Sequence, residues 1–197
     1  SILNSDLIRE ISFYTGSFPA NRGGALSSVM DITLKDGNPD KQAFKATIGA
    51  SEVGVSASGH IGRKTTYIAS VRQSYLQLLF KLLGLPMLPN YIDGQVKFKT
   101  KIDSANELVF IGLAGFDNMK LSDDPDDAAD RYLLSYLPTL RQETFTVGTS
   151  YRHFGDGHVQ TVSLGYSYLN NRSLKYLDND ESSEGNIILE SSGLEGK

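Results

Sequence analysis

Apolar and polar residues alternate with a period of two over much of the chain. Residues 44–50 read FKATIGA, with apolar side chains at the even positions. Successive side chains of a β-strand point to opposite faces, so this pattern predicts a strand with one apolar and one polar face. By residues 53–57 the apolar positions are odd. One uninterrupted strand cannot change phase, so we predict a tight turn or bulge near residues 51–52.

The same alternation predicts further strands. They cover residues 53–61, 66–75, 91–103, 142–154 and 158–171, and residues 107–118 form a strand that is apolar on both faces. In the last two alternating strands one face carries Phe145, Val147, Tyr151, Val162, Leu164, Tyr166 and Tyr168. The opposite face carries Thr, Ser and Gly. Between two strands, residues 76–90 show leucines at helical spacing before Gly84 and two prolines, which predicts a short amphipathic helix.

The predicted connections alternate in length. Short turns at residues 62–65, 103–106 and 155–157 alternate with long excursions at 76–91, 119–141 and 172–186. Outer-membrane barrels combine tight turns at one end with long loops at the other, and strands of about 10 residues span the bilayer. We therefore predict an all-β fold, part of an antiparallel transmembrane β-barrel.

The N-terminal region has a different pattern. Two short apolar runs, residues 8–14 and 28–34, flank a centre that contains Gly16, Phe18, Pro19, Arg22, Gly23 and Gly24. Glycine and proline there indicate a tight crossing between two strands. Local chemistry alone leaves an ordinary β-hairpin with a Gly-Gly turn open. Residues 35–40 are turn formers and predict a linker.

Two passages carry a family resemblance. Residues 11–32 (ISFYTGSFPANRGGALSSVMDI) resemble the end of the plug domain of TonB-dependent outer-membrane receptors, with Asn21-Arg22 where Arg-Tyr or Glu-Tyr is commoner. Residues 72–84 and 90–97 are similar to the early barrel of the Bacteroidetes-type receptors, with Gln77 where Asp is frequent. The resemblance implies that residues 1–37 are the C-terminal part of a plug domain. Residues 38–197 would be the N-terminal part of the barrel, about seven or eight strands, so we expect the chain to be a fragment.

The resemblance also implies a function. Such a receptor sits in the bacterial outer membrane and imports a scarce, bulky ligand, such as a siderophore, vitamin, oligosaccharide or peptide. TonB, contacting an upstream segment, would displace the plug, the long loops would recognise the ligand, and a surface lipoprotein could act as a lid. Two alternatives remain: a non-transporting barrel or adhesin, and a soluble all-β binding module whose tyrosine-rich face packs against a second sheet.

Composition narrows these classes. The formal net charge is −4, and charged residues of both signs occur along the chain, which argues against a nucleic-acid partner. The chain has no cysteine and no stretch of about 20 apolar residues, so a membrane location would require a barrel. It also lacks the spacings of a phosphate loop and of a nucleophile elbow. We therefore expect neither an enzyme nor a cofactor.

Candidate site residues lie mainly on the polar faces. Arg72, Lys97, Lys99 and Lys101 are predicted to project into the lumen, where they would meet plug carboxylates such as Asp31 or an anionic substrate; solvated lysines are the alternative. His153 and His158 with Asp156 could hold a metal, but polar residues at a turn are the favoured interpretation, so no metal is predicted. The acidic run at residues 123–127 is interpreted as a solvated charge run rather than a calcium site.

Overall fold

A computed structural model describes residues 3–16, 27–122 and 128–196, with the side chains of 128–130 excepted. It contains a two-stranded and an eight-stranded sheet, both antiparallel. The predicted all-β antiparallel class is therefore confirmed. Among the described residues the larger sheet is open, with its first and last strands at the two edges.

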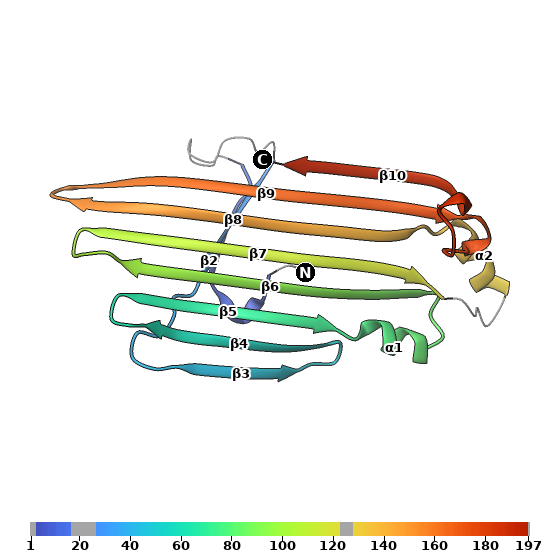
Figure 1. Ribbon diagram of the computed structural model, residues 1–197, viewed down its shortest axis with the longest axis horizontal. Coiled ribbons are helices and arrows are strands. Elements are labelled where there is room, and N and C mark those ends of the chain that lie inside the picture. The colour runs from blue at the N-terminus through green and yellow to red at the C-terminus, as the bar shows by residue number, and fades with distance from the viewer. Residues whose placement is uncertain (1–2, 17–26, 123–127, 197) are drawn as a thin grey trace.

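Every strand of the larger sheet pairs with the next strand along the chain, so the sheet is a simple meander (Figure 1). Its strands are β3 (Ala43–Ile48), β4 (Glu52–Ile61), β5 (Thr65–Ser74), β6 (Met87–Lys101), β7 (Asn106–Leu121), β8 (Thr139–Gly155), β9 (His158–Tyr176) and β10 (Ile187–Gly196). The predicted change of phase near residues 51–52 corresponds to the tight connection between β3 and β4.

The two ends of the sheet differ. The turns between β4 and β5, β6 and β7, and β8 and β9 lie at one end, which we call the short-turn end (Figure 1). The longer connections lie at the other, the long-loop end, and carry α1 (Leu76–Leu82), α2 (Ala128–Tyr136), η2 (Leu177–Asn179) and η3 (Glu184–Asn186). The predicted helix in residues 76–90 is confirmed as α1. α2 lies in an excursion for which no helix was predicted.

Several strands continue further than the alternation indicated. β6 begins at Met87 rather than residue 91, and β9 ends at Tyr176 rather than residue 171. Pro89 lies inside β6 without breaking it. The pairing of β6 with β5 ends at Ile92, so Pro89 has a strand neighbour only on the β7 side, where it faces Met119. A proline is tolerated at such an edge position because no second ladder needs its missing N–H.

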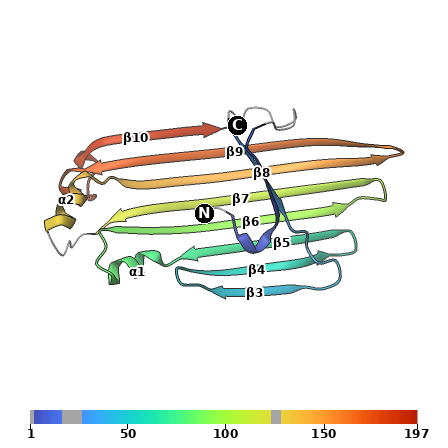
Figure 2. The same cartoon turned by 180° about the vertical axis from the view of Figure 1, so that it is seen from behind.

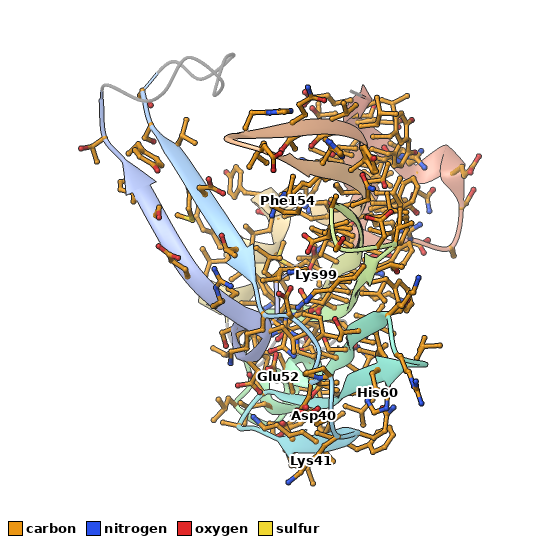
Figure 3. The ribbon with its side chains drawn as sticks, turned by 90° about the vertical axis from the view of Figure 1, so that its left-hand side faces the viewer. Asp40, Lys41, Glu52, His60, Lys99 and Phe154 are labelled. Atoms are coloured by element: carbon orange, nitrogen blue, oxygen red, sulfur yellow. The ribbon has the colours of Figure 1, made fainter. Side chains whose placement is uncertain are left out.

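The smaller sheet is a hairpin of β1 (Ile8–Tyr14) and β2 (Val29–Leu34), preceded by η1 (Ser5–Leu7). It lies against one face of the large sheet and crosses its strands steeply (Figure 2). Seen from the short-turn end, its foot touches the large sheet and its upper part stands away (Figure 3). Leu7 and Leu34 at the foot pack with Ile68 of β5 in a small buried cluster.

Candidate functional site

The two faces of the large sheet have opposite chemistry. Directly paired residues share a face, so the register assigns each side chain. The face against the hairpin, here called the inner face, is polar and includes buried Ser70, Arg72, Gln95 and Lys97. The opposite, outer face is apolar. The predicted separation of Phe145, Val147, Tyr151, Val162, Leu164, Tyr166 and Tyr168 from Thr146, Gly148, Ser150, Thr161, Ser163 and Ser167 is confirmed by the β8–β9 register.

The apolar side chains of the outer face are accessible. Phe44, Val55, Phe110, Leu164 and Tyr166, from four different strands, have exposed fractions between 39% and 79%. No described element packs over them, because the hairpin lies on the other face (Figures 2 and 3). Contiguous exposed apolar surface of this kind marks contact with a membrane or a protein partner.

Arg72 lies on the inner face and is held by carboxylates of the sheet itself. Its Nε donates to Asp93 Oδ1 at 3.0 Å and its Nη2 to Asp93 Oδ2 at 2.8 Å, a two-bond pair across β5 and β6. Nη1 lies 3.5 Å from Glu52 Oε1, and Glu52 also accepts a hydrogen bond from Tyr91. The Asp93 side chain is 2% exposed and that of Arg72 10%. Arg72 is therefore paired with a carboxylate of the large sheet itself, Asp93.

Lys97 and Lys99 bind the linker that follows β2. Lys97 Nζ donates to Asp36 Oδ1 at 2.7 Å and to the carbonyl oxygens of Leu34 and Lys35. Lys99 Nζ donates to the other carboxylate oxygen of Asp36 at 3.0 Å and lies 3.3 Å from Glu107. We call Lys97, Lys99 and Asp36 the linker clamp. The expectation that these lysines meet a carboxylate of the N-terminal segment is met by Asp36, where the sequence had suggested Asp31.

The linker clamp sets the ionisation of Asp36. Partial burial pushes the pKa of Asp36 upward, but the hydrogen bonds and positive charges of Lys97 and Lys99 outweigh it, and the pKa lies below its ordinary value of 3.8. Asp36 is thus a carboxylate at neutral pH, matched by two ammonium groups.

The hairpin foot adds further contacts with the inner face. Asn4 N–H donates to Gln95 Oε1 at 3.2 Å, and Lys45 of β3 pairs with Asp6. Gly37 is buried in the linker, and a Cβ added there would lie 2.3 Å from the carbonyl oxygen of Tyr67. The linker therefore lies directly on the backbone of the sheet, an approach that only glycine allows.

The other predicted residues form no part of the linker clamp. Lys101 is the exposed last residue of β6. Gly16 is exposed beyond the end of β1, and a Cβ added there would meet no described atom within 4 Å. Phe18, Pro19, Arg22, Gly23 and Gly24 lie outside the described residues, as does the acidic run at 123–127.

The histidines near the β8–β9 turn make separate contacts. His153 Nδ1 lies 2.9 Å from Asn106 Oδ1, and His158 Nδ1 lies 3.2 Å from the carbonyl oxygen of Asp156. In the part of the chain that the structure describes, no group of three or more His, Asp or Glu side chains is placed to share a metal.

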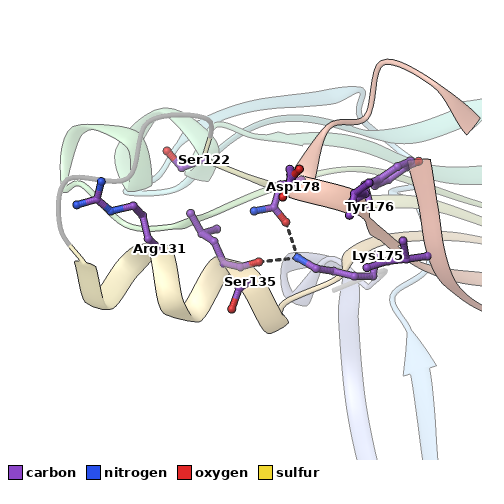
Figure 4. A pocket seen from close by; sticks show the side chains of 10 residues that line it. Ser122, Arg131, Ser135, Lys175, Tyr176 and Asp178 are labelled. Atoms are coloured by element: carbon purple, nitrogen blue, oxygen red, sulfur yellow. Dashed lines mark hydrogen bonds between the residues drawn. The ribbon is translucent and has the colours of Figure 1, made fainter. Parts of the chain in front are cut away.

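A second candidate site lies at the long-loop end, between α2 and the end of β9 (Figure 4). This pocket has a volume of about 600 Å³ and mixes polar residues, among them Ser135 and Asn179, with apolar Leu134 and Ile188. Lys175 is buried at its base and donates to the carbonyl oxygens of Leu134 and Leu137 and to Asn179 Oδ1. A lysine bound to the last carbonyls of a helix caps it.

The backbone next to this pocket is unusual. Asp178 and Asn179 both have positive φ, at 52° and 59°. Asp and Asn adopt this left-handed region more readily than most residues, and such conformations cluster at functional loops. Sequence reasoning missed this pocket because it treated residues 119–141 as an irregular polar excursion. The run AADRYLLSY at 128–136, with its good helix formers, was the available signal.

Comparison with family models, curated proteins and solved structures finds no match to this chain. Within the described residues, none of the helices has the length and apolar character needed to span a membrane.

Proposed function

We propose that this chain is part of an outer-membrane receptor of the TonB-dependent class. Residues 38–197 form the first strands of its barrel, and residues 1–37 form the end of the plug that fills the lumen. The receptor imports a scarce, bulky ligand and is not an enzyme. The observation that carries the proposal is the inverted sheet: the hairpin foot and the linker pack on its charged face, and its apolar face is exposed.

A soluble sandwich would have the opposite arrangement. Its tyrosine-rich face would pack against the second sheet, because burial of apolar surface is what stabilises a fold in water. Here Tyr151 and Tyr166 are 39% and 48% exposed, and the second sheet lies on the polar side. In a lipid bilayer, by contrast, the apolar side needs no protein cover.

Aromatic side chains support the same assignment. Tyr67, Phe98 and Phe110 form a row across β5, β6 and β7 near the short-turn end, with ring centroids 6.4–6.5 Å apart. Phe116 lies six residues beyond Phe110 on the same face of β7, about 20 Å along the strand. Outer-membrane barrels carry aromatic girdles at the two edges of an apolar band about 25 Å tall.

This proposal assigns a direction to the molecule. The short-turn end faces the periplasm and the long-loop end faces outward, which is the habit of such barrels. The pocket between α2 and β9 then lies among the extracellular loops, where the ligand is first bound. The linker clamp lies at the periplasmic end, where TonB acts on the plug through a segment upstream of Ser1.

The experiment compares two neighbouring positions of β9. Leu164 is 71% exposed on the outer face, and Ser163 bonds to Ser150 on the inner face. Since the chain has no cysteine, Leu164→Cys and Ser163→Cys give a matched pair of single labels in it. With a fluorophore attached, in full-length protein purified from the outer membrane and reconstituted, we expect brominated lipid to quench the Leu164→Cys label strongly and the Ser163→Cys label weakly. Equal quenching, or recovery of the protein in the soluble fraction, would refute the proposal.

A non-transporting barrel or adhesin is the second candidate, because exposed apolar strands would serve it equally well. Binding of the purified periplasmic domain of TonB to the full-length receptor distinguishes the two. A transporter binds it, whereas a passive barrel does not.

A further inference from the structure

A cavity separate from the pocket at the long-loop end lies on the inner face, next to the linker clamp and at the short-turn end. It has a volume of about 280 Å³. The linker forms one wall, with Asp36, and the ends of β4, β5 and β6 with the β4–β5 turn form the other. The wall of the sheet contributes His60, Arg63, Lys64, Thr66, Lys99 and Lys101.

The cavity has an excess of positive charge. Four cations line it, and the carboxylate of Asp36 is the one acidic group in its lining. Lys99 is already paired with Asp36 and Glu107. Arg63, Lys64 and Lys101 form no ion pair with any carboxylate among the described residues. Positive charge gathered in a recess raises the local concentration of anions.

One polar atom at the cavity lacks a partner. Nδ1 of His60 is buried and forms no hydrogen bond within the described residues. The strand register places His60, Thr66 and Lys99 in one row across β4, β5 and β6, all on the inner face. Buried polar atoms nearly always have a hydrogen-bond partner, so an unpaired ring nitrogen in one row with Thr66 and Lys99 points to a missing ligand.

We propose that this cavity binds one anionic group, a phosphate or a carboxylate. Arg63, Lys64, Lys99 and Lys101 surround the charge, and Thr66 and His60 complete the hydrogen bonds. The biological role of this site rests on the proposed function. In such a receptor the cavity lies at the periplasmic end of the lumen, and the imported ligand carries an anionic group. A phospholipid headgroup offers the same chemistry as a free solute.

Anion binding is coupled to the linker, because both use Lys99. An anion in the cavity competes with Asp36 for that ammonium group and weakens the linker clamp. Removing the charge of Asp36 should therefore strengthen anion binding. Removing the charge of Arg63 or Lys101 should weaken it.

The test measures inorganic phosphate binding to delipidated full-length protein in detergent by calorimetry, at fixed ionic strength. For the Arg63→Gln/Lys101→Gln double variant we expect the Kd to rise at least about tenfold, because two charge-assisted contacts are lost. For Asp36→Asn we expect the Kd to fall. Lys120→Gln, an exposed lysine at the long-loop end of β7, is the matched control and should leave the Kd unchanged.

Each outcome decides the inference. No phosphate binding by the wild type, or equal binding by the double variant, would overturn it. Faster migration of unboiled than boiled protein on a gel reports the folded barrel for every variant, so that failure of the proposed function is recognised separately. Phosphorus analysis before delipidation identifies the source: lipid phosphate lost in the double variant indicates a headgroup, and equal lipid phosphate with weakened phosphate binding indicates a solute.

Discussion

Breaking the Arg72–Asp93 pair is expected to destabilise the protein strongly. The change Asp93→Asn removes the negative charge with little change of volume. The ion pair with Glu52 remains, but there the nearest oxygen lies 3.5 Å from the guanidinium instead of 2.8 Å. Arg72 is 10% exposed at its side chain, so water cannot replace the lost partner.

The magnitude follows from the burial of the pair. Removing one partner of a buried ion pair costs about 3–5 kcal/mol, since it leaves an uncompensated charge in a poorly solvated place. The contact that Arg72 keeps with Glu52 brings the expected loss to the lower end, about 3 kcal/mol. The double change Arg72→Met/Asp93→Leu removes both charges, and we expect it to cost less than Asp93→Asn alone.

The free energy of unfolding is measured by urea titration of the full-length protein in lipid vesicles. Glu190→Gln is the control, because Glu190 also pairs with an arginine, Arg172, at 2.8 Å, but with both side chains well exposed. Exposed pairs contribute little to stability, so the control should differ only slightly from wild type. A loss below about 1 kcal/mol for Asp93→Asn, or a double variant less stable than the single one, would refute the buried-pair account.

Two further predictions concern the linker. Gly37→Ala places a Cβ 2.3 Å from the carbonyl oxygen of Tyr67, so the linker must lift from the sheet and limited proteolysis should cut it faster. Gly16→Ala, with no described atom within 4 Å of its added Cβ, is the control and should leave cleavage unchanged. The linker clamp lowers the pKa of Asp36 in the folded state below the ordinary value of 3.8. The stability that ionised Asp36 contributes is therefore complete above pH 3.8 and is lost as the pH falls through the lower pKa of the folded state. Wild type should therefore lose more stability than Asp36→Asn between about pH 4 and pH 2. Parallel acid titrations of the two proteins would contradict this; the comparison cancels Asp6, whose pKa Lys45 also lowers.

The sequence predicted the strands and their faces well wherever one face was apolar. In β8 and β9 the alternation of residues 145–151 and 162–168 agrees with the register throughout. It failed at the ends of β6 and β9. Residues 170–173, Asn-Asn-Arg-Ser, are polar on both faces and so have no period, yet the ladder with β8 continues through them. Backbone pairing extends a strand beyond its amphipathic part, and no side-chain pattern records it.

The contacts of the site were harder to predict. That Arg72, Lys97 and Lys99 lie on one face follows from their spacing, and the structure agrees. Their partners depend on how the hairpin foot rests on the sheet, which local sequence does not specify. Asp36 lies in the turn-rich linker predicted for residues 35–40, whereas Asp31, the suggested partner, lies within a predicted strand. The close approach of Gly37 to the sheet makes Asp36 the partner, because it brings the linker within reach of both lysines.

The hairpin foot has the composition of a detachable contact. Its buried apolar cluster is Leu7, Leu34 and Ile68, each contributing about 1.5–3 kcal/mol, with partly buried Ile8 and Ile111 packed against it, and the linker clamp adds polar contacts. Water entering the interface can solvate Asp36, Lys97 and Lys99 once they separate, so opening costs far less than exposing an apolar core of equal area. Under the proposed function, the contact between the plug and the barrel needs this property. It holds the lumen closed through many modest contacts, and a pull along the chain can break them one after another while the wall, stabilised by its own ladders and by lipid, stays intact.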